Sequence, residues 1–310
     1  MSENAASDAA RRQLQEKLAE LREKRHLPED LITVVGETAA LQLAARDAVS
    51  FGADGMPLPD AILARFASAS ERAQGKPALR PTDFPLDPRQ TEELAQAVLT
   101  ALGAKVPALA PFVRKLEQRL RTEPGLLEEA CRAVQAEFAG DEPASSCLRE
   151  WAASCPEAPG LLRFTAQSAM MPTVEAVAGF LGREHDIASA WPHGHCPVCG
   201  GPPLIGRLAG DGGARLHVCS FCSFEYRAPR TDCPFCLAPL ADGADYYTAP
   251  EEPGYSIAAC PTCRNYLKLA DFRSGNRVWL PRLDDLGSLA LDFYAESKGY
   301  TRPTPSAWGF

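Results

Sequence analysis

Apolar residues recur every three to four positions through the first 190 residues, which is the period of amphipathic helices. Leu14, Leu18 and Leu21 share one face of a predicted helix that Asp8 can cap. The same pattern predicts an all-helical domain over residues 1–190. Its further helices are expected over 31–49, 59–73, 88–103 (opened by Pro88 and stopped by Gly103), 109–120, 127–138, 144–155 and 161–182, with an extended proline-rich linker over 77–88.

The pattern changes between residues 191 and 272, where short runs of β-branched and aromatic residues alternate with glycine and proline. One hairpin is predicted with strands at 204–205 and 216–218 around the turn 210–213. A second is predicted with strands at 246–248 and 255–257 around the turn 251–254. Beyond them, a last amphipathic helix is predicted over 284–299 and is expected to pack back onto the rest of the chain. The side chains expected on its apolar side are Leu286, Leu289, Ala290, Phe293 and Tyr294.

These elements predict a multi-domain α+β protein. An all-α domain (1–190) is followed by a tandem pair of small rubredoxin-like or zinc-ribbon-like modules (191–230 and 231–272) and by a C-terminal helix and tail (273–310). Each module is too small to fold without a bound metal. Only ten residues separate Cys222 from Cys233, so the two modules are expected to pack closely.

The cysteines carry the candidate chemistry. Eight of the eleven form four Cys-x-x-Cys pairs, separated by 19, 10 and 23 residues. Two thiolates on one tight turn, or knuckle, can bind one metal ion, and two knuckles complete a tetrahedral four-sulfur site. Four knuckles therefore predict two metal sites. The expected ligands are Cys196, Cys199, Cys219, Cys222, Cys233, Cys236, Cys260 and Cys263.

The pairing of the knuckles has two solutions. Sequential pairing joins the first knuckle to the second and the third to the fourth, and the shorter loops favour it entropically. Nested pairing instead joins the second knuckle to the third and the first to the fourth. Disulfide bonds and a thioredoxin-like dithiol are less favoured, because no signal peptide and no single Cys-x-x-Cys beside a βαβ unit is found. His193 and His195 precede the first knuckle, but eight thiolates already complete two sites.

Charge and hydropathy exclude other classes. The formal net charge is −8, and residues 191–272 carry six Lys and Arg against eight Asp and Glu. Nucleic-acid binding requires clustered cations, and the pair Arg227 and Arg230 is the only local basic feature, so no nucleic-acid partner is expected. No apolar run approaches the ~20 residues of a membrane span, so a cytoplasmic protein without membrane insertion is predicted. No catalytic constellation is visible, which predicts a protein that is not an enzyme.

The motifs Cys196-Pro-Val-Cys-Gly-Gly, Cys219-Ser-Phe-Cys, Cys233-Pro-Phe-Cys and Cys260-Pro-Thr-Cys-Arg-Asn-Tyr-Leu-Lys resemble those of the bacterial formate dehydrogenase accessory proteins, the FdhE family. The stretch from Asp284 to Asp292, running on to Gly299-Tyr300, is similar to the C-terminal segment of that family. The resemblance is strong from about residue 190 to 302.

The resemblance implies a cytoplasmic, chaperone-like maturation factor that binds the catalytic subunit of formate dehydrogenase before export. It also implies two rubredoxin-like sites that hold iron on the eight cysteines, with zinc as the alternative occupant because both metals accept tetrahedral sulfur. The alternative functions are a tandem-rubredoxin electron carrier and, less favoured by the charge, a zinc-ribbon nucleic-acid-binding module.

Overall fold

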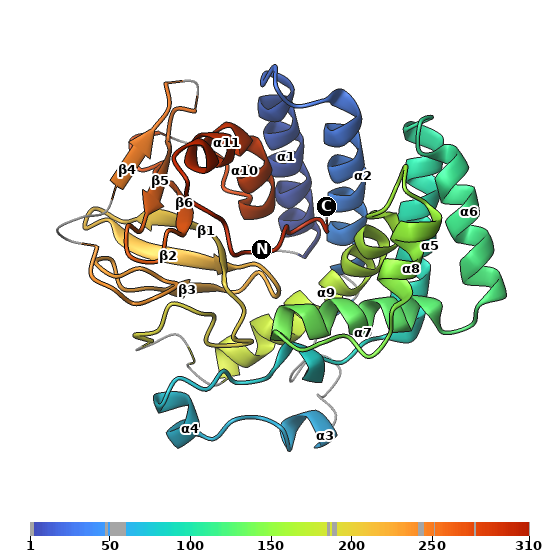
Figure 1. Ribbon diagram of the computed structural model, residues 1–310, viewed down its shortest axis with the longest axis horizontal. Helices are drawn as coiled ribbons and strands as arrows, with labels where there is room; N and C mark the ends of the chain where they lie inside the picture. The colour runs from blue at the N-terminus through green and yellow to red at the C-terminus, as the bar shows by residue number, and fades with distance from the viewer. Residues whose placement is uncertain are drawn as a thin grey trace. The chain divides into compact units, whose positions relative to one another are not determined.

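The computed structural model describes residues 3–46, 49, 60–184, 187, 191–240, 245–250, 252–275 and 277–309 (Figure 1). The chain divides into two compact units. The helical unit comprises Met1–Ala64, Pro81–Val177 and Trp308–Phe310, and the sheet unit comprises Arg65–Arg80 and Ala178–Ala307.

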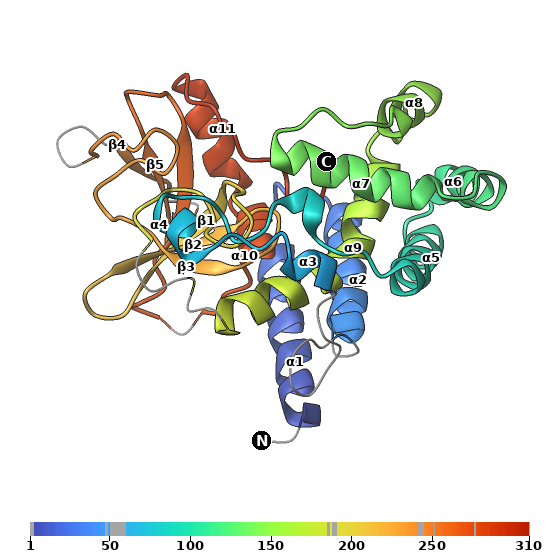
Figure 2. The same cartoon turned by 90° about the horizontal axis from the view of Figure 1, so that it is seen from below.

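The helical unit is built from consecutive helices that pack on their neighbours. Contacts join α1 to α2, α2 to α5, α5 to α6 and α7 to α8, and Figure 2 shows α5 and α6 end-on, side by side. The elements are α1 (Glu3–Arg22), α2 (Glu29–Arg46), α3 (Asp60–Leu63), a 3₁₀ turn (Pro81–Asp83), α5 (Pro88–Lys105), α6 (Ala110–Thr122), α7 (Leu126–Ala139), α8 (Cys147–Ser154) and α9 (Leu161–Glu184), whose last residues belong to the sheet unit.

The start of α5 shows how the sequence sets a helix boundary. Pro88 occupies the first turn, and the carboxylate of Asp87 accepts a hydrogen bond from the N–H of Gln90 at 3.0 Å. At the end of α7, Gly140 adopts a left-handed conformation with φ of 75°, which ends the helix close to the predicted end at residue 138.

Several predicted helix boundaries are wrong. Asp8 lies inside α1, which begins at Glu3, so Asp8 does not cap it. Gly103 does not stop α5, which continues to Lys105. The helix predicted over 59–73 is two short helices, α3 and α4 (Ala69–Ala73), because Ser68 and Glu71 form a capping box that starts a new helix. The predicted ends at residues 47–48 and at 59 lie outside the described residues.

The sheet unit contains one six-stranded sheet with the strand order β3-β2-β1-β6-β5-β4. Both predicted hairpins are confirmed, β1 with β2 and β4 with β5, although residue 251 of the second turn lies outside the described residues. Strands β3 and β6 were not predicted. The strands are β1 (Pro203–Ala209), β2 (Ala214–Cys219), β3 (Glu225–Arg227), β4 (Asp245–Thr248), β5 (Tyr255–Ala259) and β6 (Tyr266–Ala270).

The two ribbon segments are joined by the parallel pairing of β1 with β6, at Gly206↔Leu269 and Arg207↔Ala270. A Cβ at Gly206 would lie 2.7 Å from Leu269 Cδ2, so a larger residue there would have to displace the Leu269 side chain. The expected close packing of the two ribbon segments is confirmed, because they share one sheet (Figure 1). The boundary between residues 230 and 231 remains a prediction.

The C-terminal helix is also interrupted. Residues 281–297 form α10 (Pro281–Gly287) and α11 (Leu289–Ser297), with the hydroxyl of Ser288 donating to the Asp284 and Asp285 carbonyls at the break. The break changes which face is buried. Phe293 is 68% exposed, contrary to the prediction, while Leu291 and Ala295 pack on side chains of β5 and β6. The expectation that this segment packs back onto the chain is confirmed.

Candidate metal centres

The four knuckles share one backbone geometry. In each, the N–H of the residue after the second cysteine donates to the carbonyl of the first cysteine: Gly200 to Cys196 at 2.8 Å, Ser223 to Cys219 at 3.2 Å, Leu237 to Cys233 at 2.9 Å and Arg264 to Cys260 at 2.9 Å. The N–H of each first cysteine donates to the carbonyl of the residue five positions on, at 2.8–3.0 Å. Each pair of thiols is thus held on a closed, rigid turn.

The residue after each second cysteine is left-handed. Gly200 has φ of 79°, which agrees with the role of glycine at this position. The other three knuckles use Ser223, Leu237 and Arg264, with φ of 56°, 60° and 60°. Among the described residues, these three are the only non-glycine residues with positive φ. The sequence therefore indicated the left-handed conformation only at the first knuckle, where the residue is a glycine.

The thiols gather into two clusters. The first cluster contains Cys196, Cys199, Cys219 and Cys222, the second contains Cys233, Cys236, Cys260 and Cys263, and the sulfur atoms of each lie within 4.8 Å of one another. Sequential pairing of the knuckles is therefore confirmed, and nested pairing is wrong.

The sulfur separations fit a metal ion. They are 3.7 Å for Cys196–Cys222, Cys233–Cys263 and Cys236–Cys260, and 3.3 Å for Cys199–Cys219. A tetrahedron with metal–sulfur bonds of about 2.3 Å has edges of about 3.8 Å. A disulfide bond is only about 2.0 Å long, and all eight cysteines are free. Each cluster could therefore hold one tetrahedral metal ion.

Electrostatics also favour a cation in the first cluster. Burial raises the pKa of the Cys199 and Cys222 thiols well above the usual value, and neighbouring thiols add to this effect. At Cys219 burial also opposes ionisation, but hydrogen bonds from the other thiols outweigh it and lower the pKa. Burial thus opposes ionisation of all four thiols, and a bound cation would stabilise their thiolate forms.

The two clusters differ in exposure. All four cysteines of the first cluster are at most 1% exposed. In the second cluster Cys236 is exposed and Cys263 is partly exposed. A segment from the predicted linker contributes to this difference, because Ala78 and Leu79 donate backbone hydrogen bonds to the carbonyls of Pro197 and Val198, each at 2.9 Å. The first knuckle is therefore covered by a strap, residues 77–79.

The histidines before the first knuckle lie outside both clusters. His193 and His195 stack at 5.4 Å between ring centroids, and both contact the ring of Trp191. His195 Nε2 lies 2.9 Å from the carbonyl oxygen of Gly75. Burial lowers the pKa of His195, although this hydrogen bond opposes the shift. Neither histidine belongs to a ligand cluster, which agrees with the expectation that eight thiols complete the two sites.

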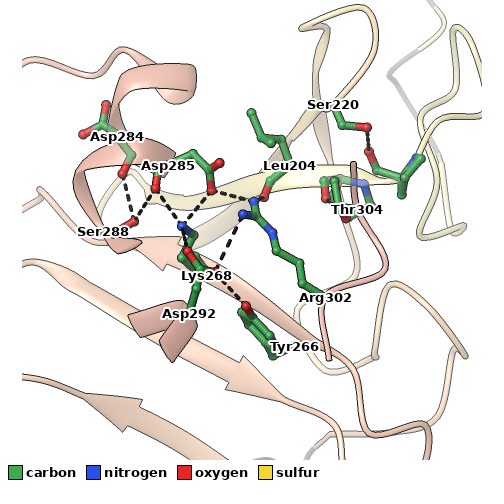
Figure 3. Close-up of polar contacts among 12 residues, drawn as sticks. Leu204, Ser220, Tyr266, Lys268, Asp284, Asp285, Ser288, Asp292, Arg302 and Thr304 are labelled. Atoms are coloured by element: carbon green, nitrogen blue, oxygen red, sulfur yellow. Dashed lines mark hydrogen bonds and ion pairs between the residues drawn. The ribbon is translucent and has the colours of Figure 1, made fainter. Parts of the chain in front are cut away.

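A buried ion network supports the second ribbon segment (Figure 3). Lys268 of β6 is fully buried and binds Asp285 Oδ1 at 2.9 Å and Asp292 Oδ2 at 2.5 Å. Arg302 binds Asp285 at 2.5 Å, and the hydroxyl of Tyr266 donates to Asp292 at 2.7 Å. Two cations thus balance two carboxylates, and the network fastens α10 and α11 to the sheet.

The sequence motifs included these residues but did not reveal their role. Lys268 stands between Leu267 and Leu269 in a strand whose five residues are all buried. A lysine inside such an apolar run is the available signal for a buried ion pair. The partners, which lie 17 and 24 positions further along the chain, had no comparable signal.

The remaining cysteines are in the core of the helical unit. Cys131, Cys147 and Cys155 are 0%, 3% and 1% exposed, as expected for buried free thiols. Among the described residues, no helix is long and apolar enough to cross a membrane.

The fold and the clusters define a class of protein in which a helical region precedes a sheet with two four-cysteine sites. Residues 195–230 match the family model described as "FdhE, central domain". The chain is 29% identical to "Protein FdhE homolog" of Aquifex aeolicus over 48% of its length and 53% of that relative. It is 29% identical to "Protein FdhE" of Shigella boydii over 93% of its length and 84% of that protein.

The crystal structure of the FdhE protein from Pseudomonas aeruginosa has the same fold, with a TM-score of 0.64 over 96% of this chain and 94% of that one, at 24% identity. The matches to two other relatives cover only part of those proteins. They span 53% of the Aquifex aeolicus homolog and 40% of a Pseudomonas putida homolog. Together these matches confirm the predicted resemblance to the FdhE family.

Proposed function

We propose that this chain is a cytoplasmic accessory factor for the maturation of formate dehydrogenase, that it binds the catalytic subunit before export, and that it is not itself an enzyme. The observation that carries the proposal is the pair of four-thiol clusters in a chain that resembles FdhE proteins over 93% of its length. Four sulfurs around each site leave no open position for a substrate.

Each cluster is proposed to hold one metal ion, iron or alternatively zinc, on the eight cysteines predicted as ligands. Bound iron would supply one-electron redox chemistry, whereas zinc would supply a structural cross-link only. The chain itself contributes the rigid knuckles and backbone N–H groups that face sulfur, such as Gly201 N to Cys199 Sγ and Phe235 N to Cys233 Sγ, each at 3.4 Å.

The test is complementation in the native host. Deletion of the gene is expected to abolish formate dehydrogenase activity, the full chain is expected to restore it, and the tagged chain is expected to capture the catalytic subunit before export. Cys219→Ser is expected to lose metal and to fail in complementation, while Cys147→Ala, a buried thiol outside the clusters, is the matched control. Normal activity in the deletion strain, or no capture of the subunit, would refute the accessory role.

An electron carrier is the second candidate, and the exposure of Cys236 favours it because a redox partner could approach that sulfur. The full chain loaded with iron and the same chain loaded with zinc would separate the two functions. If both forms support maturation equally, electron transfer is not the function. If only the iron form does, and it is reduced reversibly, the carrier function gains support.

A further inference from the structure

A cavity of about 780 Å³ lies in the sheet unit beside the turn between β1 and β2. Its lining includes Arg215 of β2, Arg227 of β3, Arg230 and three glycines of the turn at 210–213. Over the part of the chain that the structure describes, this lining contains three arginines and no carboxylate. The cavity is thus a concentrated positive site on a chain with a net charge of −8.

Arg215 is the unusual member of this lining, because it is only 2% exposed and its hydrogen-bonding capacity is largely unused. Its Nη1 donates to the carbonyl of Arg230 at a long 3.4 Å, while Nε and Nη2 have no partner among the residues that the structure describes. Burial lowers the pKa of Arg215, but a guanidinium stays protonated at neutral pH. Two unsatisfied N–H groups on a buried cation are unfavourable, so the site favours an anion.

The identity of the two unused nitrogens indicates the geometry of that anion. Nε and Nη2 lie on one edge of the guanidinium plane and direct two parallel N–H bonds the same way. This edge matches the paired oxygens of a carboxylate or a phosphoryl group. Arg227 and Arg230 are exposed, so they add positive charge nearer to solvent.

The turn leaves room for such a ligand. A Cβ added at Gly210 or Gly212 would meet no atom within 4 Å, so the backbone there borders open space. Arg230 Nη1 donates to the carbonyl of Gly212 at 3.1 Å, which holds that arginine beside the turn. Asp211 of the same turn is exposed and is not part of the lining.

We propose that this cavity binds a small molecule through an oxyanion, either a phosphoryl or a carboxylate group, with Arg215 as the central cation and Arg227 and Arg230 as flanking cations. A volume of about 780 Å³ lies within the range of roughly 300–1,000 Å³ typical of small-molecule sites. The lining contains none of the eight cysteines, although Arg215 is close enough to Cys233 for their charges to interact, and the proposal does not depend on the accessory role.

Isothermal titration calorimetry on the full, metal-loaded chain tests the proposal. Inorganic phosphate, pyrophosphate and citrate are titrated at constant ionic strength, and saturable binding of at least one is expected. The preferred probe distinguishes a phosphoryl from a carboxylate ligand. Arg215→Gln is expected to weaken binding about ten- to hundredfold, because it removes charged hydrogen bonds. Arg89→Gln, on an exposed part of α5, is the matched control and is expected to change nothing.

Arg227→Gln and Arg230→Gln keep the test decisive if Arg215→Gln does not fold, because both side chains are exposed; each is expected to weaken binding severalfold. The proposal is overturned if no probe saturates, or if Arg89→Gln weakens binding as much as the cavity variants. It is also overturned if Arg215→Gln loses metal from the second cluster while anion binding persists, since Arg215 would then compensate the charge of Cys233.

Discussion

Lys268 shows what a single residue contributes to the sheet unit. Its ammonium group is fully buried in β6, where hydration is lost and the carboxylates of Asp285 and Asp292 compensate its charge. Because those carboxylates lie on α10 and α11, the lysine fixes both helices to the strand that completes the fourth knuckle.

Replacing Lys268 with methionine should therefore be strongly destabilising. The change keeps the side-chain length but leaves two buried carboxylates with only Arg302 as a cation, and we expect a loss of about 3–5 kcal/mol in the free energy of unfolding. Urea denaturation of the metal-loaded chain measures it. Lys298→Met, at the exposed position directly after α11, is the control and should change stability by less than about 0.5 kcal/mol. Equal effects of the two variants would show that the network contributes little.

The carboxylate of Asp285 predicts a pH dependence. Burial alone would raise its pKa, but Arg302 and Lys268 outweigh burial and lower the pKa below the usual value. The folded pKa then lies below the unfolded pKa of about 4, so the stabilisation is present above pH 4 and is lost as pH falls through the folded value.

In Asp285→Asn the free energy of unfolding should be lower at neutral pH and should fall less steeply between about pH 5 and pH 2. Denaturant titrations across this range, with exposed Asp211→Asn as the control, measure the slope. A variant with the same slope as the parent chain would exclude Asp285 from the acid-sensitive groups.

At the scale of elements, the four knuckles could be predicted from the sequence, but the left-handed residues and hydrogen bonds that close them could not. The spacing of the cysteines predicted four turns, and glycine predicted the left-handed residue only at Gly200. At Leu237 and Arg264 the closing hydrogen bonds impose that conformation on residues that disfavour it locally. Strand β3 has three residues, and β6 carries a lysine in an apolar run, so neither has the pattern of a strand.

The left-handed backbone after each second cysteine predicts that substitutions at Leu237 and Gly200 change stability in opposite directions. Leu237 is 49% exposed and has φ of 60°, so Leu237→Gly should stabilise the metal-loaded chain by about 1 kcal/mol. Gly200→Ala should destabilise it by at least as much, because the new Cβ would also lie 3.0 Å from Pro77 Cγ. Thermal unfolding of both variants tests this. Destabilisation by Leu237→Gly would mean that its exposed side chain contributes more than the strain removes.

At the scale of the whole chain, the sequence predicted two similar sites but not their difference. The four knuckles have similar motifs, and nothing near Cys233 or Cys260 announces a more exposed cluster. The strap at residues 77–79 lies more than one hundred positions before the first knuckle. A segment that covers a site so far along the chain has no local sequence signal. The sequence therefore predicted residues 77–79 only as part of an extended linker, although they cover the first metal centre.

The two clusters should therefore release metal in a fixed order. A chelator or a thiol reagent reaches sulfur at Cys236 directly, whereas the first cluster opens only when its cover moves. Adding a chelator and an alkylating reagent together should give two phases of metal release. Mass spectrometry should find Cys233, Cys236, Cys260 and Cys263 alkylated in the fast phase, and Cys196, Cys199, Cys219 and Cys222 in the slow one.

Ala78→Pro tests whether the strap causes the delay. Proline removes the N–H that donates to Pro197, so release from the first cluster should accelerate while release from the second keeps its rate. Alkylation of both clusters at one rate in the parent chain would show that exposure does not control access. A slow first cluster that Ala78→Pro leaves unchanged would place the protection in the sheet and the knuckle backbone instead, where the four buried thiols are held by the closed turns themselves.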